Sequence, residues 1–236
     1  MSVIVFTRAN DLDGITCAVI AKQAFGDDAK IILESPISID DRFVDTFDIK
    51  TYYDTDEEKE IYDIFGSDKL YAADRVYVVD LFLKDDLLYR IGRNPVVNRK
   101  FAIYDHHDDA IRNGAGHYLF NDVRKKDRNE RLVSSANIFY ENLIKKGLIQ
   151  ETKKLNDLVE LVRLNITNDA LGVEANNMAE QLKVLHEAVG DAGFFNSIQD
   201  KVSVEKNSKL EFDDREKKII ENYKKKQEQG EEPNEE

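Results

Sequence analysis

The fold is decided by the stretch Phe101-Ala102-Ile103-Tyr104-Asp105-His106-His107, in which four apolar or aromatic residues run directly into an acid and two histidines. A short apolar run of this kind predicts a buried strand. Two further runs have the same form, because Val76-Tyr77-Val78-Val79 leads into Asp80 and Val3-Ile4-Val5-Phe6 precedes Asp11-Leu12-Asp13-Gly14. Three predicted strands therefore end in acidic or imidazole side chains.

The first half of the chain alternates predicted strands with helical patterns, and the second half is mostly helical. The remaining elements that we expect are a strand over 30–33, an edge strand over 117–120, and helices over 14–25, 85–91, 135–146, 155–168, 174–189, 194–198 and 213–227. Alternation of strand and helix is typical of a parallel sheet. We predict an α/β fold, with a mostly parallel sheet flanked by helices and a helical C-terminal portion.

Composition and charge limit the partners of this chain of 236 residues. The net charge of −13 argues against binding to duplex DNA, but it leaves room for a small anionic substrate that is handled through metal ions. No run approaches the ~18 apolar residues of a membrane span, and the N-terminus lacks a basic signal-peptide start. The single cysteine, Cys17, excludes an internal disulfide framework, so we expect a cytoplasmic protein with no membrane partner.

The three polar strand ends should meet, because the carboxyl ends of parallel strands lie on one side of a sheet, where ligands bind. Four carboxylates and two imidazoles in one place repel one another unless cations are bound. Aspartate and histidine suit manganese, magnesium, zinc or iron, and a pair of metals ~3.5–4 Å apart is a common arrangement for phosphoester hydrolysis. The residues therefore predict a metal site with phosphoesterase chemistry.

Each of these residues has an ordinary structural explanation when it is taken alone. Asp80 or Asp105 can cap a helix, and an Asp-x-Asp sequence is frequent in loops. His117 and His186 do not follow strands, so we interpret them as structural or surface residues. The occurrence of all three acid-bearing strand ends in one chain favours the metal site.

Together these motifs resemble the DHH phosphoesterase superfamily, in its nano-RNase and RecJ-like branch. The similarity is carried by Asp105-His106-His107, by Asp11-Leu12-Asp13-Gly14, by Val78-Val79-Asp80-Leu81, and by the segments Ser134-Ser135-Ala136-Asn137 and Leu164-Asn165-Ile166-Thr167-Asn168-Asp169-Ala170-Leu171. It covers roughly residues 3–200. We accordingly expect a DHH-like phosphoesterase domain over 1–200, followed by a helical linker and acidic tail over 201–236.

The resemblance implies a role for each matching residue. It implies that the metal ligands are Asp11, Asp13, Asp80, His106 and Asp169, with Asp80 bridging two metals. It places His107 near the scissile phosphate and Asp105 behind the histidines, which it orients. The implied cofactor is manganese, as two ions or one, with magnesium as the alternative, and a hydroxide that bridges the metals attacks phosphorus.

The chain departs from the family pattern before the first motif, where a metal-binding histidine is expected and Thr7-Arg8-Ala9 stands instead. Three explanations remain open for Arg8: it holds a substrate phosphate, it replaces the charge of a metal in a one-metal site, or it marks an inactive protein. We include Arg8 with His107 and Asp105 among the catalytic candidates.

A second departure is that nothing resembles the C-terminal substrate-binding domain of nano-RNases, so the chain is either a naturally short form or is cut before that domain. Substrate binding would then fall to Arg8, to a second subunit in a homo-oligomer, or to the basic stretch 124–131. That stretch provides the candidates Arg124, Lys125, Lys126 and Arg128, although such a run is most often a solvated loop.

Two functions of different classes follow from these observations. The first is a metal-dependent phosphoesterase that hydrolyses short single-stranded RNA or small nucleotides, with a pyrophosphatase-like hydrolase ranked below it. The second is a catalytically impaired pseudo-phosphoesterase that binds a nucleotide or a partner protein. Metal binding and turnover distinguish the two.

Overall fold

The computed structural model describes residues 1–35, 73–81, 83, 88, 91, 95–112, 122–167, 169, 172–203 and 208–229. Its centre is a five-stranded sheet in the order β2-β1-β3-β4-β5, and every pairing in it is parallel. The strands are β1 (Val3–Arg8), β2 (Ala29–Glu34), β3 (Arg75–Val79), β4 (Phe101–Asp105) and β5 (Asp122–Val123). The predicted α/β fold is confirmed, and only the short β5 was not expected.

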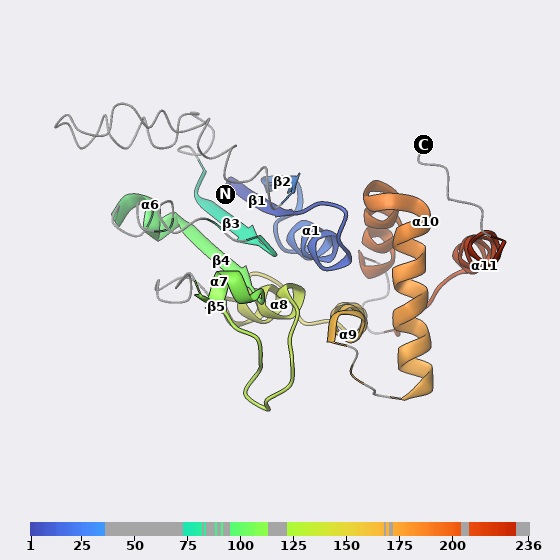
Figure 1. Ribbon diagram of the computed structural model, residues 1–236. Coiled ribbons are helices and arrows are strands. Elements are labelled where there is room, and N and C mark those ends of the chain that lie inside the picture. The colour runs from blue at the N-terminus through green and yellow to red at the C-terminus, as the bar shows by residue number, and fades with distance from the viewer. Residues whose placement is uncertain are drawn as a thin grey trace.

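Helices flank this sheet and make up the second half of the chain (Figure 1). They are α1 (Leu12–Phe25), the 3₁₀ turn η1 (Gly26–Asp28), α6 (Pro95–Lys100), α7 (Asp108–Arg112), α8 (Ser135–Lys145), α9 (Lys153–Thr167), α10 (Val173–Ser203) and α11 (Asp214–Glu228). The helices predicted over 174–189 and 194–198 are two arms of α10, which bends at Gly190 (φ 66°, ψ 177°). No helix in the described part of the chain is long and apolar enough to cross a membrane.

Two sequence predictions fall largely or wholly outside the described residues. The edge strand expected over 117–120, which includes His117, lies outside them. Of the helix expected over 85–91, only Leu88 and Ile91 are described, and both are helical. Neither prediction is therefore tested.

Alternate residues of each strand face opposite sides of the sheet, as the period of a strand requires. One face packs against α1 and α8, with α9 and α10 packed behind them, and contributes Val3, Val5, Tyr77, Val79, Ala102 and Tyr104 to the core. The other face buries Ile4, Phe6, Val76, Val78, Phe101 and Ile103 against residues that include Leu81 and Leu83. Cys17 is fully buried on the first face, as its position in the predicted helix suggests.

The strand order places a topological switch at the centre of the sheet, because the chain leaves β1 for β2 on one side and later returns as β3 on the other. In open α/β sheets the crevice beyond such a point is where ligands bind. Gly14 allows the chain to turn tightly there, since a Cβ at this position would lie 2.2 Å from the carbonyl oxygen of Arg8. The residues that follow β1, β3 and β4 therefore share one edge.

Candidate metal centre

Asp13 joins the first turn of α1 to the start of α8. Its side chain is 1% exposed, and its two oxygens accept the backbone N–H groups of Ser135 at 2.7 Å and Ala136 at 2.9 Å. The amino end of a helix favours a negative charge, and these bonds oppose the larger effect of burial. Burial nevertheless raises the pKa of Asp13 to about 7. The carboxylate therefore lies where a positive charge would stabilise it.

Ser135 connects Asp80 to His106. Its Oγ donates to Oδ1 of Asp80 at 2.9 Å and lies 2.9 Å from Nδ1 of His106. A hydroxyl has a single hydrogen, so when Asp80 is ionised the Nδ1 of His106 must be the donor to Oγ. This tautomer leaves a lone pair on Nε2 of His106. Burial lowers the pKa of His106 to about 4, so the ring is neutral at pH 7, which is the form that binds a metal.

Asp105 and Arg8 hold His107 from its two sides. Oδ1 of Asp105 lies 2.7 Å from Nδ1 of His107 and also accepts the backbone N–H groups of both histidines, at 2.7 and 3.1 Å. Nη1 of Arg8 lies 3.1 Å from Nε2 of His107. A guanidinium only donates, so Nε2 accepts and the proton of His107 is on Nδ1. The bond to Asp105 raises the pKa of His107, and burial and then the charge of Arg8 work against that rise.

Four of these residues form a group that fits a metal ion. Asp80, Asp105, His106 and His107 each offer a ligand atom, and the four atoms lie within 4.8 Å of one another. Oδ2 of Asp80 and Oδ2 of Asp105 are buried with no hydrogen-bond partner among the described residues. A buried carboxylate oxygen without a partner is costly, and a divalent cation satisfies it. The donor set of oxygen and imidazole nitrogen suits manganese, magnesium or zinc.

The conformation of Asp80 adds to this interpretation. Its φ is +58°, in the left-handed region that few residues other than glycine, asparagine and aspartate adopt. Burial raises the pKa of Asp80 well above its usual range, and the charges of Asp13, Asp11 and Asp105 add to the effect. An electrostatic cost of this kind at the end of a strand is typical of a functional site.

The structure holds the remaining predicted ligands, Asp11 and Asp169, in other contacts. Oδ1 of Asp11 caps α1 by accepting the N–H groups of Asp13 and Gly14, and its Oδ2 lies 3.8 Å from Nε of Arg8. Asp169 forms an ion pair with Arg163, a buried arginine that also bonds to Glu160. Asp11 is therefore linked to His107 of this group by Arg8, which contacts both. Asp169 instead pairs with Arg163 of α9.

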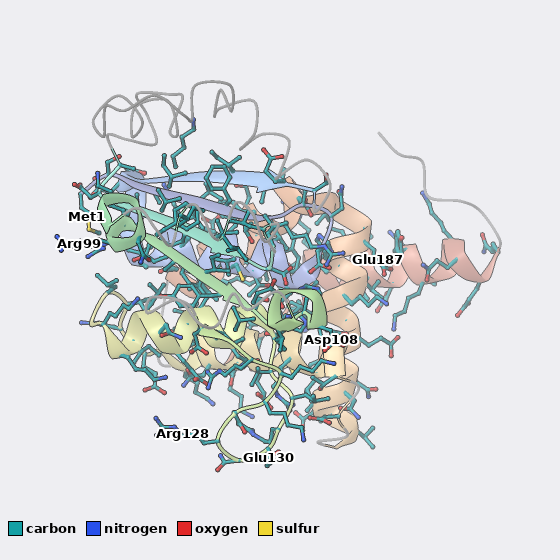
Figure 2. The ribbon with its side chains drawn as sticks, turned by 60° about the vertical axis from the view of Figure 1, so that its left-hand side comes forward. Met1, Arg99, Asp108, Arg128, Glu130 and Glu187 are labelled. Carbon is teal, nitrogen blue, oxygen red and sulfur yellow. The ribbon has the colours of Figure 1, made fainter. Side chains whose placement is uncertain are left out.

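The basic stretch 124–131 forms part of a loop in which Lys126 pairs with Leu132 as an antiparallel bridge. Four of its five basic side chains have acidic neighbours: Arg124–Glu141 at 2.6 Å, Lys125–Asp108 at 2.6 Å, Lys126–Glu130 at 3.1 Å and Arg131–Asp127 at 2.9 Å. Lys125 forms an ion pair with Asp108, which lies just after the two histidines. Figure 2 shows that the tip of the loop, with Arg128 and Glu130, lies away from Asp108.

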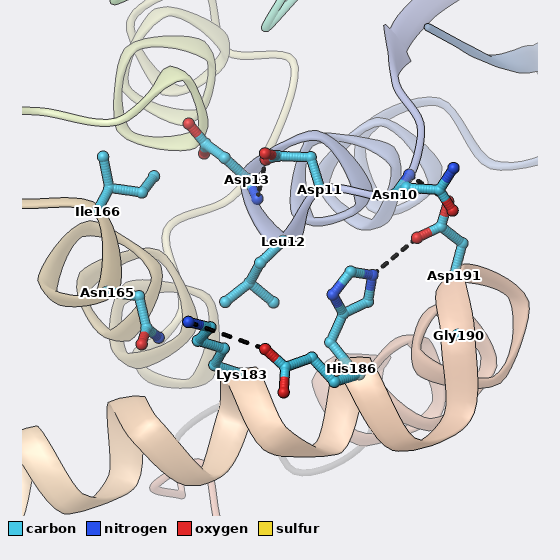
Figure 3. Close-up of a pocket in the computed structure, with 11 residues that line it drawn as sticks. Asn10, Asp11, Leu12, Asp13, Asn165, Ile166, Lys183, His186, Gly190 and Asp191 are labelled. Carbon is cyan, nitrogen blue, oxygen red and sulfur yellow. Dashed lines mark hydrogen bonds and ion pairs between the residues drawn. The ribbon is translucent and has the colours of Figure 1, made fainter. Parts of the chain in front are cut away.

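A cavity of about 430 Å³ opens beside the first turn of α1. Its lining comes from residues 10–13, from α9 and from α10, as Figure 3 shows. On its α10 side, Nε2 of His186 lies 2.7 Å from Oδ1 of Asp191, whose Oδ2 accepts the N–H of Asn10 at 2.8 Å. His186 thus contacts a residue, Asp191, that ties α10 to the loop before α1, and its assignment as a structural residue stays a prediction.

The sequence did not reveal Ser135 as part of the site. Its neighbour Ser134 caps α8 and forms a capping box with Asn137. That pattern marks the start of a helix, but it does not show which distant carboxylates the helix will meet. The contacts of Ser135 with Asp80 and His106 needed the tertiary structure.

No protein-family model matches the chain. Its sequence is 29% identical over 154 residues to "Oligoribonuclease NrnB" of Bacillus subtilis (strain 168), which is 65% of this chain and 34% of that protein. The chain is similar to an oligoribonuclease. It spans about a third of the length of that relative.

A solved structure resembles the whole chain. It is the crystal structure of an uncharacterized protein from Helicobacter pylori G27, with a TM-score of 0.54 and 17% sequence identity, and the match covers 100% of this chain and 65% of that one. Similarity at this level of identity concerns the fold alone.

Proposed function

We propose that the chain is a divalent-cation-dependent phosphoesterase of the DHH type, acting on short single-stranded RNA or small nucleotides. The observation that carries the proposal is the pair of buried, unpartnered carboxylate oxygens of Asp80 and Asp105, grouped with His106 and His107. The similarity to an oligoribonuclease supports the substrate class. The negative net charge favours a short substrate, because a long polyanion is repelled outside the site.

The residues that would hold the cation are Asp80, Asp105 and His106, with Asp13 beside them at 3.5 Å from Nδ1 of His106. When bound, a divalent cation lowers the pKa of a water molecule and polarises a phosphoryl oxygen. Ser135 prepares His106 for this role by accepting a hydrogen bond from its Nδ1, which fixes the tautomer and leaves a lone pair on Nε2. Manganese is the proposed ion, and magnesium is the alternative.

His107 and Arg8 are the more accessible polar groups at this edge, with side chains 33% and 32% exposed. We assign them to the scissile phosphate. A guanidinium has five N–H donors, so the contacts of Arg8 with Asp11 and His107 leave others for phosphoryl oxygens. Asp105 keeps the His107 ring in place through their 2.7 Å contact.

Hydrolysis of a diribonucleotide or of bis-p-nitrophenyl phosphate by the manganese-loaded chain tests the proposal. Asp80→Asn should abolish turnover, whereas Asp214→Asn on the exposed surface of α11 provides a matched control that should not. Absence of hydrolysis by the native chain in manganese and in magnesium would refute the proposal. Tight nucleotide binding without turnover would support the second candidate, an inactive nucleotide-binding protein.

That second candidate is favoured by one observation, the contact between Arg8 and His107. An arginine whose Nη1 lies against Nε2 of the imidazole blocks that nitrogen from a metal. The first candidate remains ahead, because the unpartnered oxygens of Asp80 and Asp105 persist beside this contact. A chain that only binds nucleotide has no use for them.

The basic stretch 124–131 is a separate proposal for substrate binding. Reversing the charges of Lys126 and Arg128 should raise KM for a short RNA substrate several-fold and leave kcat nearly unchanged, because the loop would contribute binding that is equal in the ground and transition states. Lys217→Glu on α11 is a matched charge reversal. A KM equal to that of the native chain would remove the loop from the site.

A further inference from the structure

Arg8 ends β1 between two residues that the motif resemblance assigns to the metal centre and its substrate. Its Nη1 lies 3.1 Å from Nε2 of His107, and its Nε lies 3.8 Å from Oδ2 of Asp11. The two contacted residues are 96 positions apart in the chain, one before α1 and one after β4. The arginine therefore joins two of the strand ends at which the site is built.

The ligand atoms on that side of the site are already engaged. Both nitrogens of His107 have partners, Asp105 at Nδ1 and Arg8 at Nε2. Oδ1 of Asp11 caps α1 while its Oδ2 faces Arg8, and both oxygens of Asp13 accept N–H groups of α8. A second cation there would have to displace Arg8 from His107 and share carboxylate oxygens that already accept hydrogen bonds.

Two buried carboxylate oxygens at this edge have no hydrogen-bond partner in the described part of the chain, Oδ2 of Asp80 and Oδ2 of Asp105. Asp80 and Asp105 belong with His106 to the group whose ligand atoms lie within 4.8 Å of one another. Two carboxylates and one imidazole, completed by water, make an ordinary site for one divalent cation.

The charge of Arg8 works in the same direction. A guanidinium remains protonated at any working pH, so it is a permanent positive charge beside Asp11 and His107. It repels a second divalent cation at that place and at the same time balances the carboxylate of Asp11, which is what a cation would do there.

We propose that Arg8 takes the place of one of the two cations that the motif resemblance implies, so that this site binds a single divalent ion. The ion is held by Asp80, Asp105 and His106, and the guanidinium supplies the second positive charge. The use of that charge in phosphate-ester hydrolysis rests on the proposed function, whereas the number of bound ions does not.

Manganese binding to the full chain tests this inference without any assay of activity. Equilibrium dialysis with metal analysis should give one Mn²⁺ per native chain, with the electron paramagnetic resonance spectrum of an isolated ion. Arg8→Ala should raise the capacity to two per chain, with the signature of a coupled pair, because Asp11 and His107 become free. Arg8→Lys keeps a positive charge and should stay at one, as should Arg215→Ala on the exposed surface of α11.

Two results would overturn the inference: two coupled ions in the native chain, or one ion in a folded Arg8→Ala variant. If Arg8→Ala does not fold, as judged by circular dichroism, then Arg8→Gln decides, because it keeps a polar side chain while removing the charge. One ion without hydrolysis would refute the proposed function and leave this inference standing. Two ions with hydrolysis would do the reverse, and no binding at all would refute both.

Discussion

Replacement of Asp80 by asparagine should make the metal-free protein more stable above neutral pH and should remove its response to manganese. Burial, followed by the charges of Asp13, Asp11 and Asp105, raises the pKa of Asp80 well above the 3.8 of an unperturbed carboxyl. The folded chain therefore keeps a proton that the unfolded chain releases. Its contribution to stability is present in full below the unfolded pKa and is lost as the pH rises toward and through the folded pKa.

A difference of one bound proton changes the free energy of unfolding by about 1.4 kcal/mol per pH unit, which is the steepest loss that Asp80 alone can contribute as the pH rises above 6.5. Asp13, whose pKa burial raises to about 7, adds to the loss in the same direction. The window begins at pH 6.5 because His106 has the opposite sign. Its pKa falls from 6.5 to about 4 on folding, so its contribution is complete above pH 6.5 and is lost as the pH falls toward 4.

Asparagine is a mild substitution at position 80 in every respect except charge. It tolerates the φ of +58°, and its Oδ1 can still accept from the hydroxyl of Ser135. Asp80→Asn should therefore lose less stability than the native chain between pH 6.5 and pH 8, because it has no proton to release at this position. The buried oxygen that would bind the cation is replaced by an amide nitrogen, so manganese should no longer raise the stability.

Urea unfolding of the native chain and of Asp80→Asn, at pH 6.5 and pH 8 in EDTA and then in manganese, measures these effects. Asp214→Asn, an exposed acid in the first turn of α11, serves as the control and should behave as the native chain. The reasoning fails if the metal-free native chain is equally stable at both pH values. It also fails if Asp80→Asn loses as much stability as the native chain does, or if manganese still stabilises the variant.

Three further substitutions have expected outcomes. Gly14→Ala should lower the free energy of unfolding in urea by about 3 kcal/mol, because its Cβ would lie 2.2 Å from the carbonyl oxygen of Arg8. Native-like stability of this variant would refute that close approach. Ser135→Ala removes the hydroxyl that orients His106, so the folded variant should bind manganese about 10- to 100-fold more weakly in calorimetry. An unchanged affinity would contradict that role. Arg163→Ala should lower the free energy of unfolding by about 2–3 kcal/mol, because it leaves Glu160 unpaired and opens a void. A loss below about 0.5 kcal/mol would show that the buried guanidinium is dispensable.

The longer strands and helices and the convergence of the strand ends were predictable from the sequence, whereas the short elements η1, α6, α7 and β5 were not predicted. The run Val76–Val79 is short, contains no charged residue and is rich in β-branched valine, and these features together indicate a buried strand. Once the strands are parallel, handedness requires the residues after each of them to lie at one edge. The neighbourhood of Asp80 and His106 follows from these two rules, and the contact that Ser135 makes to both confirms it.

Long-range partners depended on packing that no local pattern encodes. The N–H of Ser135 meets Asp13 across 122 positions, and Arg8 meets His107 across 99, because helices and crossovers bring these segments together in space. Asp169 illustrates the same limit, since its motif position suggests a ligand and its nearest cation is Arg163 of α9. Periodicity and capping act over a few residues, so the sequence pattern predicts the helices and strands. Which distant residue a polar side chain contacts is decided only when those helices and strands pack together.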